Sequence, residues 1–113
     1  MATPVLVNGV SGVTGTAANV RAMSCDVEQF AIYNPNTGAV FVQLFDMPSG
    51  AQLPTLGSTV PKYSFGVGPT GALHSSFTVS GLRFEGGLWV AATTTVGGAT
   101  GPTTAVVVNL ALT

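Results

Sequence analysis

The hydrophobic residues of this chain occur in short runs of strand length, separated by glycine, proline and asparagine. The runs are rich in valine, phenylalanine and threonine, and none keeps the apolar spacing that an amphipathic helix requires. Strands are expected at residues 19–25, 28–33, 39–45, 60–67, 73–79, 82–85, 88–94 and 104–112. On the last run, Val106, Val108, Leu110 and Leu112 share one face. About eight short strands predict an all-β chain that folds as a single antiparallel β-sandwich of the jelly-roll or Greek-key type.

The run that follows the Asn-Pro-Asn turn is apolar on both faces of the expected strand. Alternate residues from Val40 to Leu44 share one side, and Phe41 and Phe45 share the other. A strand with one face in water should alternate between apolar and polar residues, and this one does not. We therefore expect the core to cover one face and a neighbouring subunit or capsid to cover the other. Phe41, Phe45 and Trp89 are the candidate interface residues.

The first sixteen residues are rich in glycine and are expected to form an extended arm outside a sandwich of residues 17–113. Within the arm, Pro4, Val5, Leu6 and Val7 form a short extended piece that is predicted to contact another subunit or a capsid surface. Because glycine-rich backbone is costly to order, such a contact would have to offset that cost. Deletion of residues 1–16 is expected to leave the sandwich folded.

Charge is scarce: 6% of the residues are charged, against about 25% in an ordinary soluble domain. Such a surface does little to keep monomers apart, so it is either covered by uncharged polar groups or buried against other subunits. The net charge of −1 offers no basic stripe, and neither nucleic acid nor a membrane surface is an expected partner. No apolar run reaches the roughly 18 residues of a membrane span, and the first residues do not read as a secretory signal.

Residues that could carry catalysis or bind a metal are few. Cys25 and His74 are the only residues of their kinds, and a nucleophile–base pair between them would need a third group to orient it. Asp26, Glu28 and Asp46 could approach a cation, but two or three scattered acids more often lie on a solvated rim. The sequence therefore predicts neither a metal site nor an enzyme.

Two further patterns have a simpler structural interpretation. Residues 66–71 match the spacing of a dinucleotide-binding fingerprint, yet strand-like sequence follows where that motif needs a helix. We expect a hairpin loop there and no cofactor. Trp89 and the tyrosines could stack a sugar, but they alternate into positions typical of a core.

Several segments, taken in order, resemble a family of small virion proteins of tailed bacteriophages. The matching segments are IYNPN at 32–36, VQLFD at 42–46, PTLGSTVP at 54–61, SGLRFEGGLWVAAT at 80–93 and TTAVVVNL at 103–110. Met47 departs from the family pattern, which tends to have lysine there, and the C-terminus lacks the terminal aromatic residue.

The resemblance implies a β-sandwich structural protein of the particle, such as a capsid decoration (cement) protein that sits on the head as a homotrimer. Its expected partners are the major capsid protein or other virion proteins, and its expected location is the capsid surface after synthesis in the host cytoplasm. Two alternatives stay open. One is a tail- or fibre-associated module that contacts the host, and the other is a carbohydrate-binding β-sandwich module.

Overall fold

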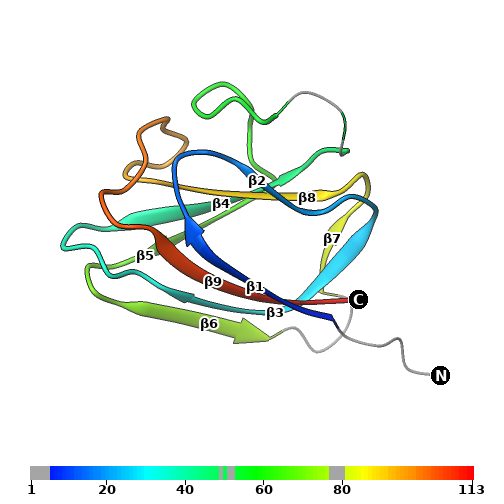
Figure 1. Cartoon of the computed structure of the whole chain (residues 1–113), viewed down its shortest axis with the longest axis horizontal. Helices are drawn as coiled ribbons and strands as arrows, with labels where there is room; N and C mark the ends of the chain where they lie inside the picture. Colours follow the sequence, from blue (N-terminus) through cyan, green and yellow to red (C-terminus); the bar gives the residue numbers. More distant parts are fainter. Residues whose placement is uncertain (1–5, 49, 51–52, 77–80) are drawn as a thin grey trace.

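The computed structural model describes residues 6–48, 50, 53–76 and 81–113, and within them it contains nine strands in two antiparallel sheets (Figure 1). The strands are β1 (Leu6–Val13), β2 (Ala18–Arg21), β3 (Cys25–Tyr33), β4 (Val40–Asp46), β5 (Tyr63–Val67), β6 (Ala72–Ser76), β7 (Leu82–Phe84), β8 (Leu88–Thr93) and β9 (Val106–Leu112). No helix occurs in this part of the chain, so none could cross a membrane there. The predicted all-β sandwich is confirmed.

The order of the strands is that of a jelly roll. One sheet has the order β1-β9-β3-β6, with β7 also paired to β3, and the other has the order β2-β8-β4-β5. Because β6 and β7 pair with successive parts of β3, they act together as one interrupted strand. When β6 and β7 are counted as one strand, each sheet has four strands, and the chain passes between the two sheets in the order of a jelly roll.

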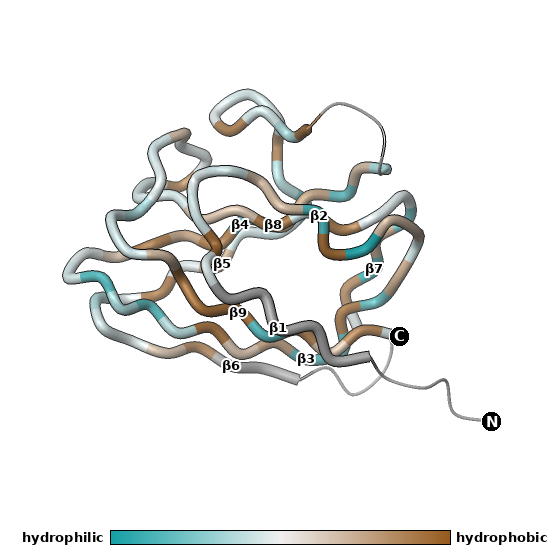
Figure 2. The backbone as a smooth tube through the Cα atoms, in the orientation of Figure 1, coloured by the Kyte–Doolittle hydropathy of each residue, from teal (hydrophilic) through white to brown (hydrophobic). Residues whose placement is uncertain are grey.

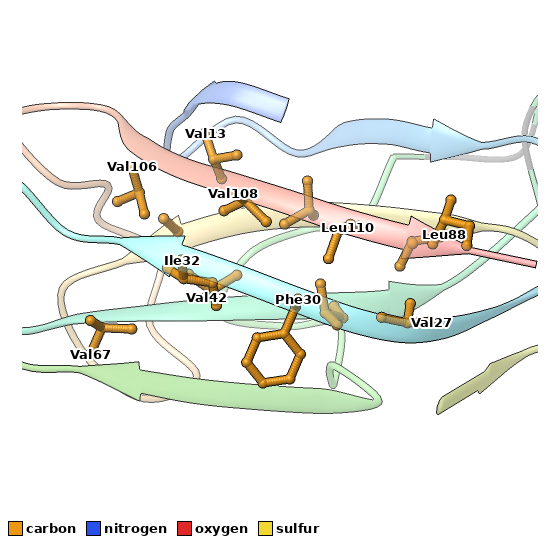
Figure 3. Close-up of a cluster of buried hydrophobic side chains, with 14 of the residues drawn as sticks. Val13, Val27, Phe30, Ile32, Val42, Val67, Leu88, Val106, Val108 and Leu110 are labelled. Atoms are coloured by element: carbon orange, nitrogen blue, oxygen red, sulfur yellow. The ribbon is translucent and has the colours of Figure 1, made fainter. Parts of the chain in front are cut away.

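The core lies between the two sheets and is built from alternate residues of each strand. On β9, the predicted inward set from Val106 to Leu112 is at most 1% exposed, whereas Val107 and Asn109 face outward. Figure 3 shows the inward side chains of β9 and β3 gathered with Val42 and Leu88 of the opposite sheet. In Figure 2, brown hydrophobic segments lie on the strands, including β9, while the loops between strands are mostly paler.

The expected boundary between an arm and a sandwich is wrong for residues 6–13. This segment is β1, which pairs with β9 of the same chain from Leu6 opposite Leu112 to Val13 opposite Val106. The register shifts before Val13, and Gly12 in the shifted stretch has a φ of 82°, a conformation that glycine adopts without the usual steric cost. Gly12 therefore allows the bulge in this edge strand.

This pairing changes two expectations for the N-terminal segment. Leu6 and Val7 pair with Leu112 and Ala111 of their own chain, and Val13 is buried in the core. Removal of residues 1–16 would open the edge of β9 and uncover part of the core, so the remaining sandwich is not expected to stay intact. The predicted contacts of Pro4 and Val5 lie outside the described residues.

Neighbouring valines on β9 test the inward and outward assignment. Val108→Ala should lower the free energy of unfolding by about 2–3 kcal/mol, because it leaves a cavity between the sheets. Val107→Ala makes the same chemical change on the outer face and should cost less than about 1 kcal/mol. Urea denaturation at one fixed protein concentration measures both. Equal losses would contradict the register of β9.

Candidate functional site

The ion pairs of the molecule gather around the short strand β7. Arg83 Nη1 lies 3.6 Å from Asp26 Oδ1, and Arg83 Nε lies 3.5 Å from Glu85 Oε1. Lys62 Nζ lies 3.5 Å from Asp46 Oδ2 and also donates a hydrogen bond to the carbonyl of Arg83. These five charged residues therefore form one linked group at the end of the sandwich near β7.

The two remaining charged residues lie at the same end. Arg21 ends β2 and pairs with Leu88, which begins β8. Glu28 accepts a hydrogen bond of 3.2 Å from the hydroxyl of Thr113, the C-terminal residue. All seven Asp, Glu, Lys and Arg residues of the chain are thus at one end of the sandwich, and the opposite end has none.

Asp46 fixes the turn between β7 and β8 at this charged end. Its two carboxylate oxygens accept hydrogen bonds of 2.8 Å from the amides of Glu85 and Gly86. Removal from water raises the pKa of the Asp46 carboxyl, but these amides and the Lys62 ammonium outweigh that effect and hold the pKa below its ordinary 3.8. The carboxylate is therefore a structural anchor.

The outer face of the four-stranded sheet is covered by the chain's own loops, which corrects the expectation of a neighbour there. Phe45 and Ala91 are fully buried and Trp89 is 7% exposed, beneath Met47 and Leu56 of the β4–β5 connection. The indole of Trp89 donates a 3.0 Å hydrogen bond to the carbonyl of Met47. This connection lies above β8 in Figure 1. Phe45 and Trp89 are thus unavailable as interface residues in this conformation.

Phe41 is the one predicted aromatic interface residue that stays partly exposed. Its ring packs over Gly66 of β5, where an added Cβ would lie 3.1 Å from the ring. Two residues further along β4, Gln43 is fully buried, and its side-chain amide donates a 2.6 Å hydrogen bond to the hydroxyl of Thr93 on β8. Both faces of β4 are covered as the sequence predicts, but the cover on the outer face belongs to this chain.

The outer face of the five-stranded sheet is open along β3 and β9. We call Gln29, Ala31, Tyr33, Val107 and Asn109 the neutral sheet face, because they are exposed, adjacent and uncharged. Tyr33 lies opposite Val107 in the β3–β9 register, and Ala31 lies opposite Asn109. Tyr33 is 47% exposed and Val107 is 37% exposed. Sequence patterning missed this face because its residues lie on two strands far apart in the chain.

Two asparagines organise the uncharged end of the sandwich. Asn34 is fully buried, and its amide nitrogen donates hydrogen bonds to the carbonyls of Gly38 (3.0 Å), Gly68 (2.9 Å) and Val67 (3.3 Å). Its side-chain oxygen accepts hydrogen bonds from both the backbone and the side-chain nitrogen of Asn36, each 2.9 Å long. The sequence indicates a turn here, but not that one amide joins the β3–β4 and β5–β6 loops.

The candidate catalytic pair is not assembled. Cys25 pairs with Phe84 and His74 pairs with Ala31, so their backbone positions are about 20 Å apart along β3. Burial raises the pKa of the Cys25 thiol; the neighbouring acids also raise it, and Arg21 and Arg83 oppose the shift. A buried thiol of raised pKa is a poor nucleophile.

The candidate metal and nucleotide sites have other structural roles. Asp26, Glu28 and Asp46 each contact a different partner, and the described residues contain no group of three or more potential ligands. Residues 66–71 connect β5 in one sheet with β6 in the other, so they do not form the expected hairpin. A strand follows them, and they lack the helix on which a pyrophosphate would sit.

Comparison of the chain with protein-family models, with curated proteins and with solved structures gave no match. The resemblance to bacteriophage virion proteins therefore supports a proposal rather than membership of a family.

The role of the Asn34 side-chain amide in holding the two loops can be tested by replacing its hydrogen-bond donor. Asn34→Asp would place a carboxylate against the carbonyls of Gly38 and Gly68, and it should lower the free energy of unfolding by about 3 kcal/mol or more. Thr37→Asp adds the same charge to an exposed position of the same loop and should cost less than about 0.5 kcal/mol. Chemical denaturation near neutral pH compares them. A small loss for Asn34→Asp would show that the amide does not hold these loops.

The role of Asp46 predicts a pH dependence of stability. Because its pKa is lower in the folded state than in the unfolded state, the carboxylate stabilises the fold above about pH 3.8. That contribution should disappear as the pH falls through the lower pKa of the folded state. Asp46→Asn should be less stable at neutral pH and should lose less stability on acidification. Parallel pH profiles of unfolding free energy for the two proteins would contradict this role.

Proposed function

We propose that this protein is a bacteriophage capsid decoration (cement) protein that assembles as a homotrimer and binds the head surface without catalysing a reaction. The observation that carries the proposal is the segregation of charge. All seven charged residues lie at one end, which leaves the neutral sheet face exposed on a rigid jelly roll. The ordered resemblance to virion proteins supports the same function.

The neutral sheet face has the properties of a surface that is covered in an assembly. Burial of a charge costs free energy unless the charge is well paired, and this face would bury none from its described side chains. Tyr33 provides an exposed aromatic ring, and interfaces are enriched in tyrosine and depleted of charge at their centre. The opposite sheet already carries its own loops, so the neutral sheet face is the open one for another copy.

A protein that stabilises a capsid needs a rigid fold and several contacts with the capsid, and it needs no catalytic activity. A sandwich with one continuous core between two sheets supplies the rigidity. A trimer would present three identical capsid contacts, and avidity would strengthen each of them. In this arrangement the neutral sheet face joins the copies, and the ends of the sandwich remain for the major capsid protein.

A tail- or fibre-associated module is the second candidate, favoured by the loops that the asparagines fix at the uncharged end. Copy number separates the two functions. A decoration protein should be present in hundreds of copies per particle and should appear over the head in cryo-electron microscopy. A handful of copies at the tail would favour the second candidate, and absence from purified particles would overturn both.

Self-association through the neutral sheet face can be tested with matched charge insertions. Ala31→Lys places a cation in the middle of the face and should weaken association at least tenfold, because the charge would be desolvated next to its symmetry mates. Ser64→Lys adds the same charge to an exposed position of β5 in the other sheet and should leave association unchanged. Sedimentation velocity compares the variants with the parent protein. Undiminished association of Ala31→Lys would exclude this face as the subunit contact.

A further inference from the structure

A pocket of about 320 Å³ opens at the uncharged end of the sandwich, beside the two asparagines. Its walls are the β3–β4 loop, with Pro35, Thr37 and Gly38, and the β8–β9 loop, with Pro102 and Thr104. This volume is at the lower end of the range for small-molecule sites. The pocket is separate from the neutral sheet face, and an inference about it does not depend on the proposed function.

The walls of this pocket are fixed against each other before any ligand binds. The side chain of Asn36 donates a 2.8 Å hydrogen bond to the carbonyl of Thr104 and accepts a 2.8 Å hydrogen bond from its amide. Asn36 is held in turn by the buried side chain of Asn34. Because the two loops are already ordered, a ligand would lose little affinity to loop ordering.

The chemistry of the lining selects for a neutral, hydroxyl-rich ligand. The side chains of Thr37, Thr103 and Thr104 are exposed, and their hydroxyls make no hydrogen bond to another described residue. Each hydroxyl can therefore both donate and accept a hydrogen bond with a ligand. Pro35 and Pro102 add partly buried apolar rings that can pack against C–H groups.

The same lining excludes other classes of ligand. No charged side chain lines the pocket, and every charged residue lies at the other end of the sandwich, so no cation is available for a phosphate, a sulfate or an acidic sugar. No aromatic or long apolar side chain lines it to anchor a peptide side chain. We propose that this pocket binds a neutral saccharide of the hexose or N-acetylhexosamine class.

The test uses the full chain labelled with ¹⁵N and three uncharged disaccharides: lactose, maltose and N,N′-diacetylchitobiose. At least one should shift the backbone amide resonances of residues 36–38, 103 and 104 in a saturable manner. An uncharged peptide and an acidic sugar serve as comparison ligands in the same titration. Saturable shifts at these residues from the peptide or the acidic sugar alone would overturn the proposal, and so would the absence of shifts with all three disaccharides.

Two glycines at the uncharged end provide a matched pair of variants. Gly38 lines the pocket and Gly68 does not, and an added Cβ at either position would meet no atom within 4 Å. Gly38→Gln should fill the pocket and weaken saccharide binding at least tenfold, while Gly68→Gln should bind like the parent protein. Equal binding by the two variants would place the saccharide elsewhere and overturn the proposal.

A third variant removes one hydroxyl and leaves the loop intact. Thr104→Val keeps the backbone groups that bond Asn36 and deletes only the side-chain donor and acceptor. Its saccharide affinity should fall about threefold to tenfold, the effect of one hydrogen bond. Unchanged affinity with an unchanged melting temperature would contradict a direct contact with Thr104.

Discussion

The ion pairs around β7 hold most of the charged side chains of the chain at one end of the sandwich. Arg83 lies between Asp26 and Glu85, and Lys62 lies against Asp46, so the few charges of the chain neutralise one another at one end. Exposed ion pairs of this kind contribute little stability individually. Their larger consequence is that charge is confined to one end of the sandwich. Both the neutral sheet face and the uncharged end can therefore be covered without desolvating an ion.

The two sheets of the sandwich have different surroundings on their outer faces. The four-stranded sheet buries Phe45 and Trp89 beneath Leu56 of its own connection, and the five-stranded sheet leaves Tyr33 and Val107 open. The molecule therefore has two different outer faces: its own loops cover one, and the other is open to a partner. This asymmetry, rather than any group of titratable side chains, is why we propose a structural function.

The face that β9 turns to the core was predictable, and the features that depend on distant contacts were not. The predicted inward set of Val106, Val108, Leu110 and Leu112 is buried and Val107 and Asn109 are exposed, although Ala111 is buried as well. The glycine-rich β1 has no such signal, since its position comes from pairing with β9 at the other end of the chain. The burial of Trp89 and the three carbonyls held by Asn34 likewise depend on loops that local patterning cannot bring together.

If copies of this chain associate through the neutral sheet face, which is uncharged, added salt should not weaken their association. Sedimentation equilibrium at about 0.05 M and about 0.5 M NaCl compares weak with strong screening of charges. We expect a homotrimer whose dissociation constant does not rise with salt. A protein that is monomeric at both NaCl concentrations, or an oligomer that dissociates at the higher one, would contradict association through an uncharged surface.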